Sequence, residues 1–297
     1  MDAMGTAYSV VLYDRNPDQM EEAVDAAFAE VRRIDHLLSA YRPASVWSEL
    51  NRHAGREPVT VSAEVFTLIS QCLQYSRASQ GAFDITVGPL LRTWGFFQGE
   101  GRLPGPQEVA AALATTGYGH IHLNPADSTV RFDIPGLEIN PGGIGKGYAV
   151  DRVVDILRQR GFHTALVMAS SSSIYGLGAP PEEPRGWKIK IRNPQRPTLH
   201  TATEVFLRDM SLSTSGSYAR TFRSGGKAFS HIMDPRTGYP APGMLQVSVT
   251  APRTIDSEAW AKPFFILGRS WAAQHKPPQF GAFFCEDGPE DAWGWLP

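Results

Sequence analysis

The sequence has few cysteines, almost no net charge and no long apolar run, and each shortage excludes a class of protein. Its two cysteines, Cys72 and Cys285, lie far apart in no metal-like spacing, which sets aside a cysteine framework and a cysteine zinc site but leaves a single disulfide open. The formal net charge of −2 gives no electrostatic footprint for DNA, RNA or an anionic membrane, so we expect no nucleic-acid partner. Since no stretch of about 18 apolar residues occurs, we also expect no transmembrane segment.

A secretion signal is missing from the first residues, MDAMGTAYSVVLYD, which have neither a basic start nor a continuous apolar core. The chain as written is therefore expected to stay in the cytoplasm. A periplasmic, membrane-anchored protein is the alternative if residues upstream of Met1 are absent from this sequence.

What the sequence does have is the composition of an ordinary globular protein, 42% hydrophobic and 20% charged, with apolar residues at helical spacing in several stretches. The predicted helices cover residues 17–41, residues 62–77, residues 106–117, the segment from Lys146 to Gly161, and residues 257–267. Ser62 is the expected N-cap of the second helix, and Pro263 is expected to end or bend the last one.

Short runs of alternating or β-branched residues between turn residues predict the strands. These runs are TAYSVVLYD near the N-terminus and then HIHLN, TVRFD, LEIN, TALVMAS, SIYGLG, WKIKIR, TEVFLR, LQVSVTA and GAFFCED. No repeat stands out, and no linker is long enough to separate domains. We therefore predict an α+β fold of mixed sheets flanked by helices, as a single globular domain over residues 1–297.

The stretch INPGGIGKGYAVD opens one predicted helix with glycines and a lysine, an arrangement that can bind a phosphate. The first turn of a helix has unpaired N–H donors, glycine lets a ligand approach the backbone, and Lys146 would add a full charge. Neither nucleotide fingerprint fits: a Walker A loop needs glycine in place of Asn140 and Ser or Thr in place of Gly147, and a dinucleotide fingerprint needs glycine in place of Tyr148. A phosphate site and a helix-capping turn with a solvated Lys146 both stay open.

Four further stretches have side chains capable of chemistry, each with a structural alternative. The hydroxyls of SLSTSGSYARTF could grip a phosphate or bond their own backbone in a turn. In AFSHIMDPRTGYP, His231 could be a general base at neutral pH or a structural hydrogen-bonding group. Glu258 and Lys262 lie four residues apart, which on a helix suits an ion pair. The aromatic residues of GAFDITVGPLLRTWGFF could stack on a flat ring, although a core position is the default.

Taken together and in order, these segments resemble the FAD:protein FMN transferases, the ApbE family. The matching segments span nearly the whole chain: MGTAYSV at Met4, LSAYRPASVWSELN at Leu38, GAFDITVGPL at Gly81, GGIGKGYAVD at Gly142, SLSTSGSYAR, SHIMDPRTGYP and APRTIDSEAWAK. Any one would be a weak signal, but all of them in one order are specific. The resemblance implies an enzyme that splits FAD, transfers FMN to a Ser or Thr hydroxyl of an acceptor flavoprotein, releases AMP and requires a divalent ion, normally Mg²⁺.

The resemblance also implies roles for particular residues. Those that would contact FAD are Met4, Tyr41, Ala82, Phe83, Asp84, Asn140, Lys146, Thr214 and His231. Lys146 would hold the two phosphates, and His231 would take the proton from the incoming hydroxyl, since a neutral hydroxyl is a poor nucleophile. The divalent ion would neutralise the diphosphate, with Gly143 and Glu258 as its ligands.

The sequence departs from the family pattern in three places. Asn140 stands where the family has an acidic residue, and the serines at 170–173 replace its Gly-Gly-Asp. The family's metal pair, an Asp and a Thr four residues later, is Glu258 and Lys262 here. Glutamate can bind Mg²⁺, whereas an ammonium has no free lone pair and repels a cation. One hypothesis places Lys262, held by Glu258, where the ion would be. The other keeps the ion on Glu258 and the Gly143 carbonyl, with Lys262 turned outward.

Two functions therefore stand beside the transferase as alternatives. One is a FAD-binding protein that has lost transfer and acts as a flavin carrier or regulator. The other is a FAD pyrophosphatase, which releases FMN and AMP without an acceptor. The presence of Lys146 and His231 favours the transferase, and the altered metal pair favours the binding protein.

Overall fold

The computed structural model describes residues 1–14, 16–97, 99–196 and 200–296 of the 297-residue chain. These residues form two compact units. Unit 1 comprises Met1–Asp35, Ile144–Gly216 and Met244–Pro297, and unit 2 comprises His36–Gly143 and Ser217–Gly243. The expectation of a single domain over residues 1–297 stays a prediction.

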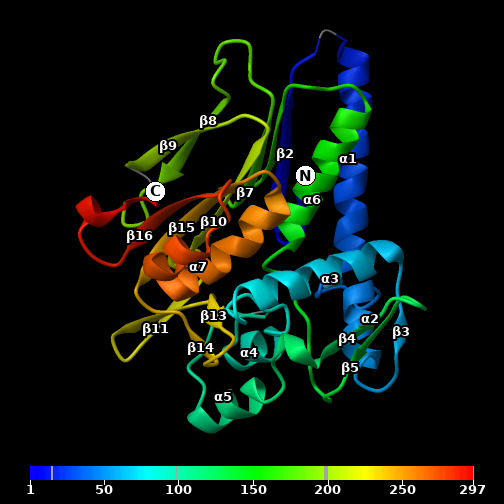
Figure 1. Ribbon diagram of the computed structural model, residues 1–297, viewed down its shortest axis with the longest axis vertical. Coiled ribbons are helices and arrows are strands. Elements are labelled where there is room, and N and C mark those ends of the chain that lie inside the picture. Colours follow the sequence, from blue (N-terminus) through cyan, green and yellow to red (C-terminus); the bar gives the residue numbers. More distant parts are fainter. Residues whose placement is uncertain (15, 98, 197–199, 297) are drawn as a thin grey trace. The chain divides into compact units, whose positions relative to one another are not determined.

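Unit 1 is built on an antiparallel sheet with the strand order β1-β2-β6-β7-β10-β15-β16-β17 (Figure 1). Its strands are β1 (Asp2–Ala3), β2 (Thr6–Leu12), β6 (Ala165–Ala169), β7 (Ser173–Leu177), β10 (Met210–Gly216), β15 (Met244–Ala251), β16 (Gly281–Glu286) and β17 (Gly294–Trp295). The register places Tyr8, Ala169, Ser173 and Ser213 opposite one another across four strands. Directly opposite residues share a face of the sheet, so these four side chains point to the same side.

Helices cover one face of this sheet and a hairpin covers the other. On the first face, α7 (Thr254–His275) packs across β10 and β15, and α6 (Gly145–Gln159) lies against β6 and β7 (Figure 1). The hairpin of β8 (Trp187–Arg192) and β9 (Thr201–Leu207) packs on the second face. Its contact is an apolar cluster of Leu166, Ile174, Trp187, Ile191, Leu207, Leu212, Phe283 and Cys285.

The remaining helices of unit 1 are α1 (Pro17–Leu38), whose last turn belongs to unit 2 from His36 on, and the short 3₁₀ turn η3 (Glu290–Ala292). The apolar residues of α1 recur at three- and four-residue steps, and the fully buried ones form one face: Ala23, Ala27, Val31, Ile34 and Leu38. This is the burial pattern that the sequence spacing predicts for an amphipathic helix.

Unit 2 combines helices with small sheets. Its helices are α2 (Val46–His53), α3 (Ala63–Ala78), α4 (Gly88–Thr93) and α5 (Pro106–Leu113), with the 3₁₀ turns η1 (Tyr118–His120) and η2 (Ser217–Ala219). Its strands are β3 (Val59–Thr60), β5 (Thr129–Phe132) and β4 (Ile121–Asn124) in one sheet, and the hairpins β11 (Thr221–Ser224) with β12 (Lys227–Ser230) and β13 (Met233–Asp234) with β14 (Tyr239–Pro240). Trp94 lies in the core, where its indole N–H donates to the Gly238 carbonyl at 2.9 Å.

Most predicted elements are present, and the α+β fold class is confirmed. The Ser62 hydroxyl accepts a hydrogen bond from the Val65 N–H at 3.3 Å, which confirms this N-cap. In the described part of the chain, no helix combines the length and the apolar character that crossing a membrane requires. The two cysteines are buried and unpaired.

Three sequence-based expectations are wrong. The run LEIN forms no strand, and SLSTSG is the inner strand β10 rather than a turn. The last helix is longer than predicted and continues through Pro263, because a proline removes only one hydrogen bond from a helix whose other contacts hold it. Its backbone leaves helical geometry at Gly268, where φ is 79°, a value that glycine adopts without strain.

Candidate functional site

Gly147, the last glycine of the glycine–lysine stretch, allows two helices of unit 1 to approach closely. α6 begins at Gly145, so Lys146 and Gly147 lie in its first turn. A Cβ on Gly147 would lie 2.5 Å from the Thr254 carbonyl oxygen and 2.9 Å from Glu258 Oε2, both on α7. Because any side chain would collide with α7, position 147 requires glycine for packing.

The negative charge at the start of α6 comes from Glu258, whose side chain is 2% exposed. Its Oε1 accepts a hydrogen bond from Lys146 Nζ at 2.6 Å, and its Oε2 accepts one from the Gly147 N–H. This carboxylate thus occupies the position where the free N–H groups and the helix dipole favour an anion. The alternative of a solvated Lys146 is wrong, since its ammonium is paired with a buried carboxylate.

Lys262 lies one turn beyond Glu258 on α7 and is partly buried. Its Nζ donates a hydrogen bond to Ser215 Oγ at 3.0 Å, and among the described residues no ion pair joins it to Glu258. Burial lowers the pKa of Lys262 to about 8; Glu258 opposes this shift, and Lys146 adds to it. The expected ion pair within α7 is therefore wrong: Glu258 pairs with α6, and Lys262 faces a neutral hydroxyl.

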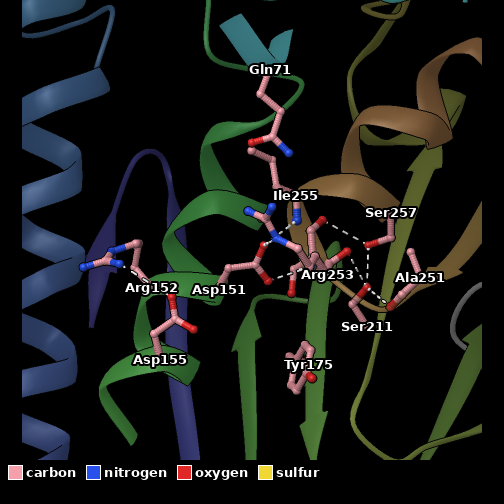
Figure 2. A network of polar contacts seen from close by, with 12 residues as sticks. Gln71, Asp151, Arg152, Asp155, Tyr175, Ser211, Ala251, Arg253, Ile255 and Ser257 are labelled. Atoms are coloured by element: carbon pink, nitrogen blue, oxygen red, sulfur yellow. Dashed lines mark hydrogen bonds and ion pairs between the residues drawn. The ribbon is translucent and has the colours of Figure 1, made fainter. Parts of the chain in front are cut away.

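Asp151, on α6, fixes the start of α7 (Figure 2). Its carboxylate accepts hydrogen bonds from the backbone N–H groups of Thr254 at 2.7 Å and Ile255 at 3.0 Å. Burial raises the pKa of Asp151 to about 6, although these hydrogen bonds and the nearby Arg253 act in the opposite direction. Asp151 thereby caps one helix from another and helps to hold Glu258 against the first turn of α6.

Serine hydroxyls fill the space between β10 and the start of α7 (Figure 2). Ser211 Oγ lies 2.7 Å from the Ala251 carbonyl oxygen and 3.0 Å from Ser257 Oγ. Ser213 Oγ lies 2.8 Å from the same Ser257 Oγ. These bonds join α7 to the middle of the sheet, so the position of Glu258 is fixed from the strand side as well.

Thr214 and Ser215 face opposite sides of β10, as neighbouring strand residues do. Thr214 Oγ1 lies 2.8 Å from Ser248 Oγ on the adjacent strand, and its contact with phosphates stays a prediction. Ser215 instead contacts Lys262. Ser215 was predicted only as one of the clustered hydroxyls that could grip a phosphate, and Asp151 was assigned no role; the signal for Asp151 was an acidic residue among the apolar positions of a predicted helix.

Met4 lies in the turn between β1 and β2. Its φ is 49° and that of Gly5 is 70°, which is the geometry of a tight hairpin turn. The Met4 N–H donates to Asp35 Oδ1 at 3.1 Å, which ties this turn to α1. Met4 is half-buried, and its contact with FAD stays a prediction.

Tyr41 lines a pocket of about 740 Å³ within unit 2. Tyr41 is 47% exposed, and the centroid of its ring lies 5.0 Å from that of Phe97. The pocket combines exposed aromatic rings with charged groups, which suits a flat ring with polar edges. Its lining residues are Tyr41, Phe97, Gly99, Glu100, Tyr218, Ala219, Arg220 and Thr221.

Ala82, Phe83 and Asp84 belong to the interior of unit 2. The Asp84 carboxylate accepts hydrogen bonds from the N–H and the hydroxyl of Thr86, at 2.8 and 2.7 Å, and from the Tyr118 N–H at 2.8 Å. Burial raises the pKa of Asp84, while the hydrogen bonds from Thr86 and Tyr118 oppose the shift. Phe83 is only 2% exposed, so its side chain is part of the core. Contact of Ala82, Phe83 and Asp84 with FAD stays a prediction.

Asn140 and His231 also belong to unit 2. Asn140 Oδ1 accepts a hydrogen bond from the Gly142 N–H at 2.8 Å, so the amide shapes the turn before the glycines. His231 is half-buried, and its ring meets the edge of Phe96 with the centroids 6.4 Å apart. The assigned roles of both residues stay predictions.

The described residues do not fit the Mg²⁺ that the resemblance implies. Among them, no group of three or more His, Cys, Asp and Glu side chains could hold a metal ion. Both oxygens of Glu258 are bonded to Lys146 and Gly147, and the Lys262 ammonium is near. Mg²⁺ needs oxygen ligands around it and is repelled by ammonium groups, so Glu258 is not a suitable ligand here, and the Gly143 carbonyl as a ligand stays a prediction.

Known proteins are similar to this chain over nearly its whole length. The FAD:protein FMN transferase of Treponema pallidum is 31% identical over 297 residues, which covers 95% of this chain and 82% of that protein. A FAD:protein FMN transferase of Klebsiella pneumoniae is 33% identical over 267 residues, with 89% and 80% covered.

Solved structures show the same fold. The ApbE protein of Thermotoga maritima has a TM-score of 0.87 at 28% identity, with 99% of this chain and 94% of that chain covered. The apo form of the Pseudomonas stutzeri flavinyl transferase ApbE has a TM-score of 0.85 at 28% identity, with 100% and 92% covered. The sequence model of the ApbE family matches residues 4–284, and the chain belongs to this family.

Proposed function

We propose that this protein transfers FMN from FAD to a Ser or Thr hydroxyl of an acceptor flavoprotein. The acceptor oxygen attacks the phosphorus on the riboflavin side, so a phosphoester bond forms while the bond from this phosphorus to the bridging oxygen breaks. AMP leaves with that oxygen, and the hydroxyl proton passes to a base. The relatives named FAD:protein FMN transferase, similar over most of the chain, support this reaction.

The observation that carries the proposal is the charged cluster where α6 and α7 meet in unit 1. Lys146 and Lys262 supply two positive charges and Glu258 one negative charge, so the cluster has a net charge of +1. The diphosphate of FAD is an anion whose charge must be neutralised before an oxygen can attack it. A partly buried cationic cluster at a helix terminus provides this environment.

His231 is the proposed base, because a half-buried imidazole can take the hydroxyl proton at neutral pH. The pocket lined by Tyr41 and Tyr218 is the proposed place for a flat ring system, since these exposed aromatic residues can stack on such groups. The divalent ion belongs to the proposal only as the family expectation. No step is assigned to it, because the Glu258 environment does not fit it.

A second function is favoured by Glu258 and Lys262, which stand where the family has an Asp and a Thr. If these two residues allow FAD to bind but do not promote transfer, the protein is a flavin carrier or regulator. A FAD pyrophosphatase is the third possibility, in which water replaces the acceptor hydroxyl. The products distinguish all three.

The test combines purified protein, FAD and a protein extract of the source cells. Covalent flavin is read as a fluorescent band on a denaturing gel and by the mass of that protein. We expect one FMN, less water, on a Ser or Thr of the acceptor, with one AMP formed for each FMN attached. The variant His231→Asn is expected to lose this band. Free AMP without labelled protein indicates a pyrophosphatase, and bound FAD without either product indicates a carrier.

A further inference from the structure

The charges where α6 and α7 meet are unevenly paired. Lys146 Nζ lies 2.6 Å from Glu258 Oε1, so these two groups neutralise each other. Within the described part of the chain, Lys262 Nζ makes one hydrogen bond, to the neutral Ser215 Oγ at 3.0 Å. An ammonium has three donors, so Lys262 keeps two further N–H groups in a partly buried position, and its charge is offset only in part by the nearby Glu258, with which it forms no ion pair.

We propose that Lys262 binds the diphosphate of FAD and neutralises it without a divalent cation. The inference rests on the proposed use of FAD as substrate. A charge that is removed from water without a directly paired counterion is costly, and a phosphate oxygen would supply both that counterion and the missing acceptors. Lys146, which is already paired, instead holds Glu258 in place. The phosphate-binding role thus moves from the lysine of the glycine-rich turn to the lysine of α7.

A divalent ion at the same place would have to compete with groups that are already bonded. To bind Glu258, it would displace Lys146 Nζ from one carboxylate oxygen and the Gly147 N–H from the other. It would then be close to two ammonium groups. The fixed charge of Lys262 needs no such displacement.

A purely structural role is the competing explanation for Lys262. Its bond to Ser215 joins α7 to β10, and that role alone would affect stability but not the affinity for FAD. Two variants therefore separate the structural role from FAD binding. Lys262→Met removes the charge but keeps a long unbranched side chain, and Lys262→Arg keeps the charge. Lys190→Met is the matched control, because Lys190 is an exposed lysine on β8 of the same unit.

The experiment measures FAD binding by flavin fluorescence, in EDTA and again in Mg²⁺, with thermal unfolding of every variant as a folding control. The wild-type affinity is expected to be the same in both buffers to within about twofold. Lys262→Met is expected to bind at least about tenfold more weakly in both, because a charge-assisted contact is lost. Lys262→Arg is expected to stay within about threefold of the wild type, and Lys190→Met to match it.

The possible outcomes separate this inference from the proposed function. Wild-type binding that requires Mg²⁺, or wild-type affinity in Lys262→Met, overturns the inference and leaves the transferase proposal intact. Tight FAD binding in EDTA without transfer to any acceptor overturns the transferase proposal and leaves the inference about Lys262 intact. A protein that binds no FAD in either buffer overturns both. If Lys262→Met does not fold, the metal content of the wild-type complex decides, since one Mg²⁺ per bound FAD contradicts the inference.

Discussion

Replacing Glu258 by glutamine distinguishes an internal counterion from a metal ligand. In Glu258→Gln, the amide oxygen can still accept the hydrogen bond from the Gly147 N–H. The other carboxylate oxygen is replaced by a neutral NH₂ group, so the Lys146 ammonium, 2.6 Å from that oxygen in the wild type, loses its counterion. The substitution therefore removes one charge from the meeting point of α6 and α7 while keeping the shape of the side chain.

The expected cost in stability follows from the burial of the two partners. Removal of one partner from a buried ion pair costs about 3–5 kcal/mol. Here Glu258 is 2% exposed, but the Lys146 side chain is 24% exposed and can turn toward water. The hydrogen bond retained with Gly147 is worth about 1 kcal/mol. We expect the free energy of unfolding, measured in urea, to fall by about 1–3 kcal/mol.

The same variant is expected to bind FAD more tightly although it is less stable. Two ammonium charges minus one carboxylate give +1 in the wild type, and without the carboxylate the cluster has +2. One added unit charge at contact distance is worth about 1 kcal/mol in a water-like environment, which corresponds to roughly fivefold in affinity. Fluorescence titration in EDTA measures this gain. If Glu258 were a metal ligand, Glu258→Gln would bind FAD more weakly in Mg²⁺; that result would refute the assignment of Glu258 as a counterion.

Two further predictions concern the packing around this cluster. Gly147→Ala is expected to lower the free energy of unfolding by about 1–2 kcal/mol, because the new Cβ would lie 2.5 Å from the Thr254 carbonyl oxygen and this overpacking outweighs the helix preference of alanine. Gly119→Ala, at a position with open space, is the control and is expected to change the value by less than about 0.5 kcal/mol. The second prediction concerns pH, since burial raises the pKa of Asp151 from 3.8 to about 6. The folded protein therefore binds the Asp151 proton more tightly than the unfolded chain does. As the pH rises from about 4 to 6, the contribution of Asp151 to the free energy of unfolding falls by at most about 3 kcal/mol. The free energies of unfolding of the wild type and Asp151→Asn, measured in urea and plotted against pH, are expected to diverge across this range. Parallel plots would contradict the raised pKa.

Much of the fold was predictable because the longer helices and strands have local signals, whereas the short helices α2 and α4 were not predicted. The apolar spacing over residues 17–41 corresponds to the buried face of α1, and the hydroxyl of Ser62 caps α3 as its position predicts. The exceptions have tertiary causes. β10 is rich in serine, which is not a strand signal, but its side chains bond to α7 and to adjacent strands. Such partners, far away in sequence, override the turn preference of serine.

The site was less predictable because sequence spacing shows which side chains share a face, but not what lies opposite them. The i,i+4 spacing of Glu258 and Lys262 suits an ion pair within α7, yet Glu258 pairs with Lys146, more than a hundred residues earlier in the chain. The cause is the close approach of α6 and α7, which Gly147 permits and Asp151 fixes. Once the carboxylate is bonded to the first turn of α6, Lys262 is left with Ser215.

A glycine–lysine turn at a helix N-terminus is therefore ambiguous for a physical reason. The free N–H groups and the lysine favour an anion, but a protein carboxylate satisfies them as well as a phosphate does. In this chain Glu258 is that anion, and Lys146 is paired with it. If Lys262 binds the diphosphate, as we propose, the ligand anion takes its charge from the next cation, one helical turn along α7. The residue at position 262 would then decide whether a phosphate is met by a fixed ammonium or is accompanied by a metal ion.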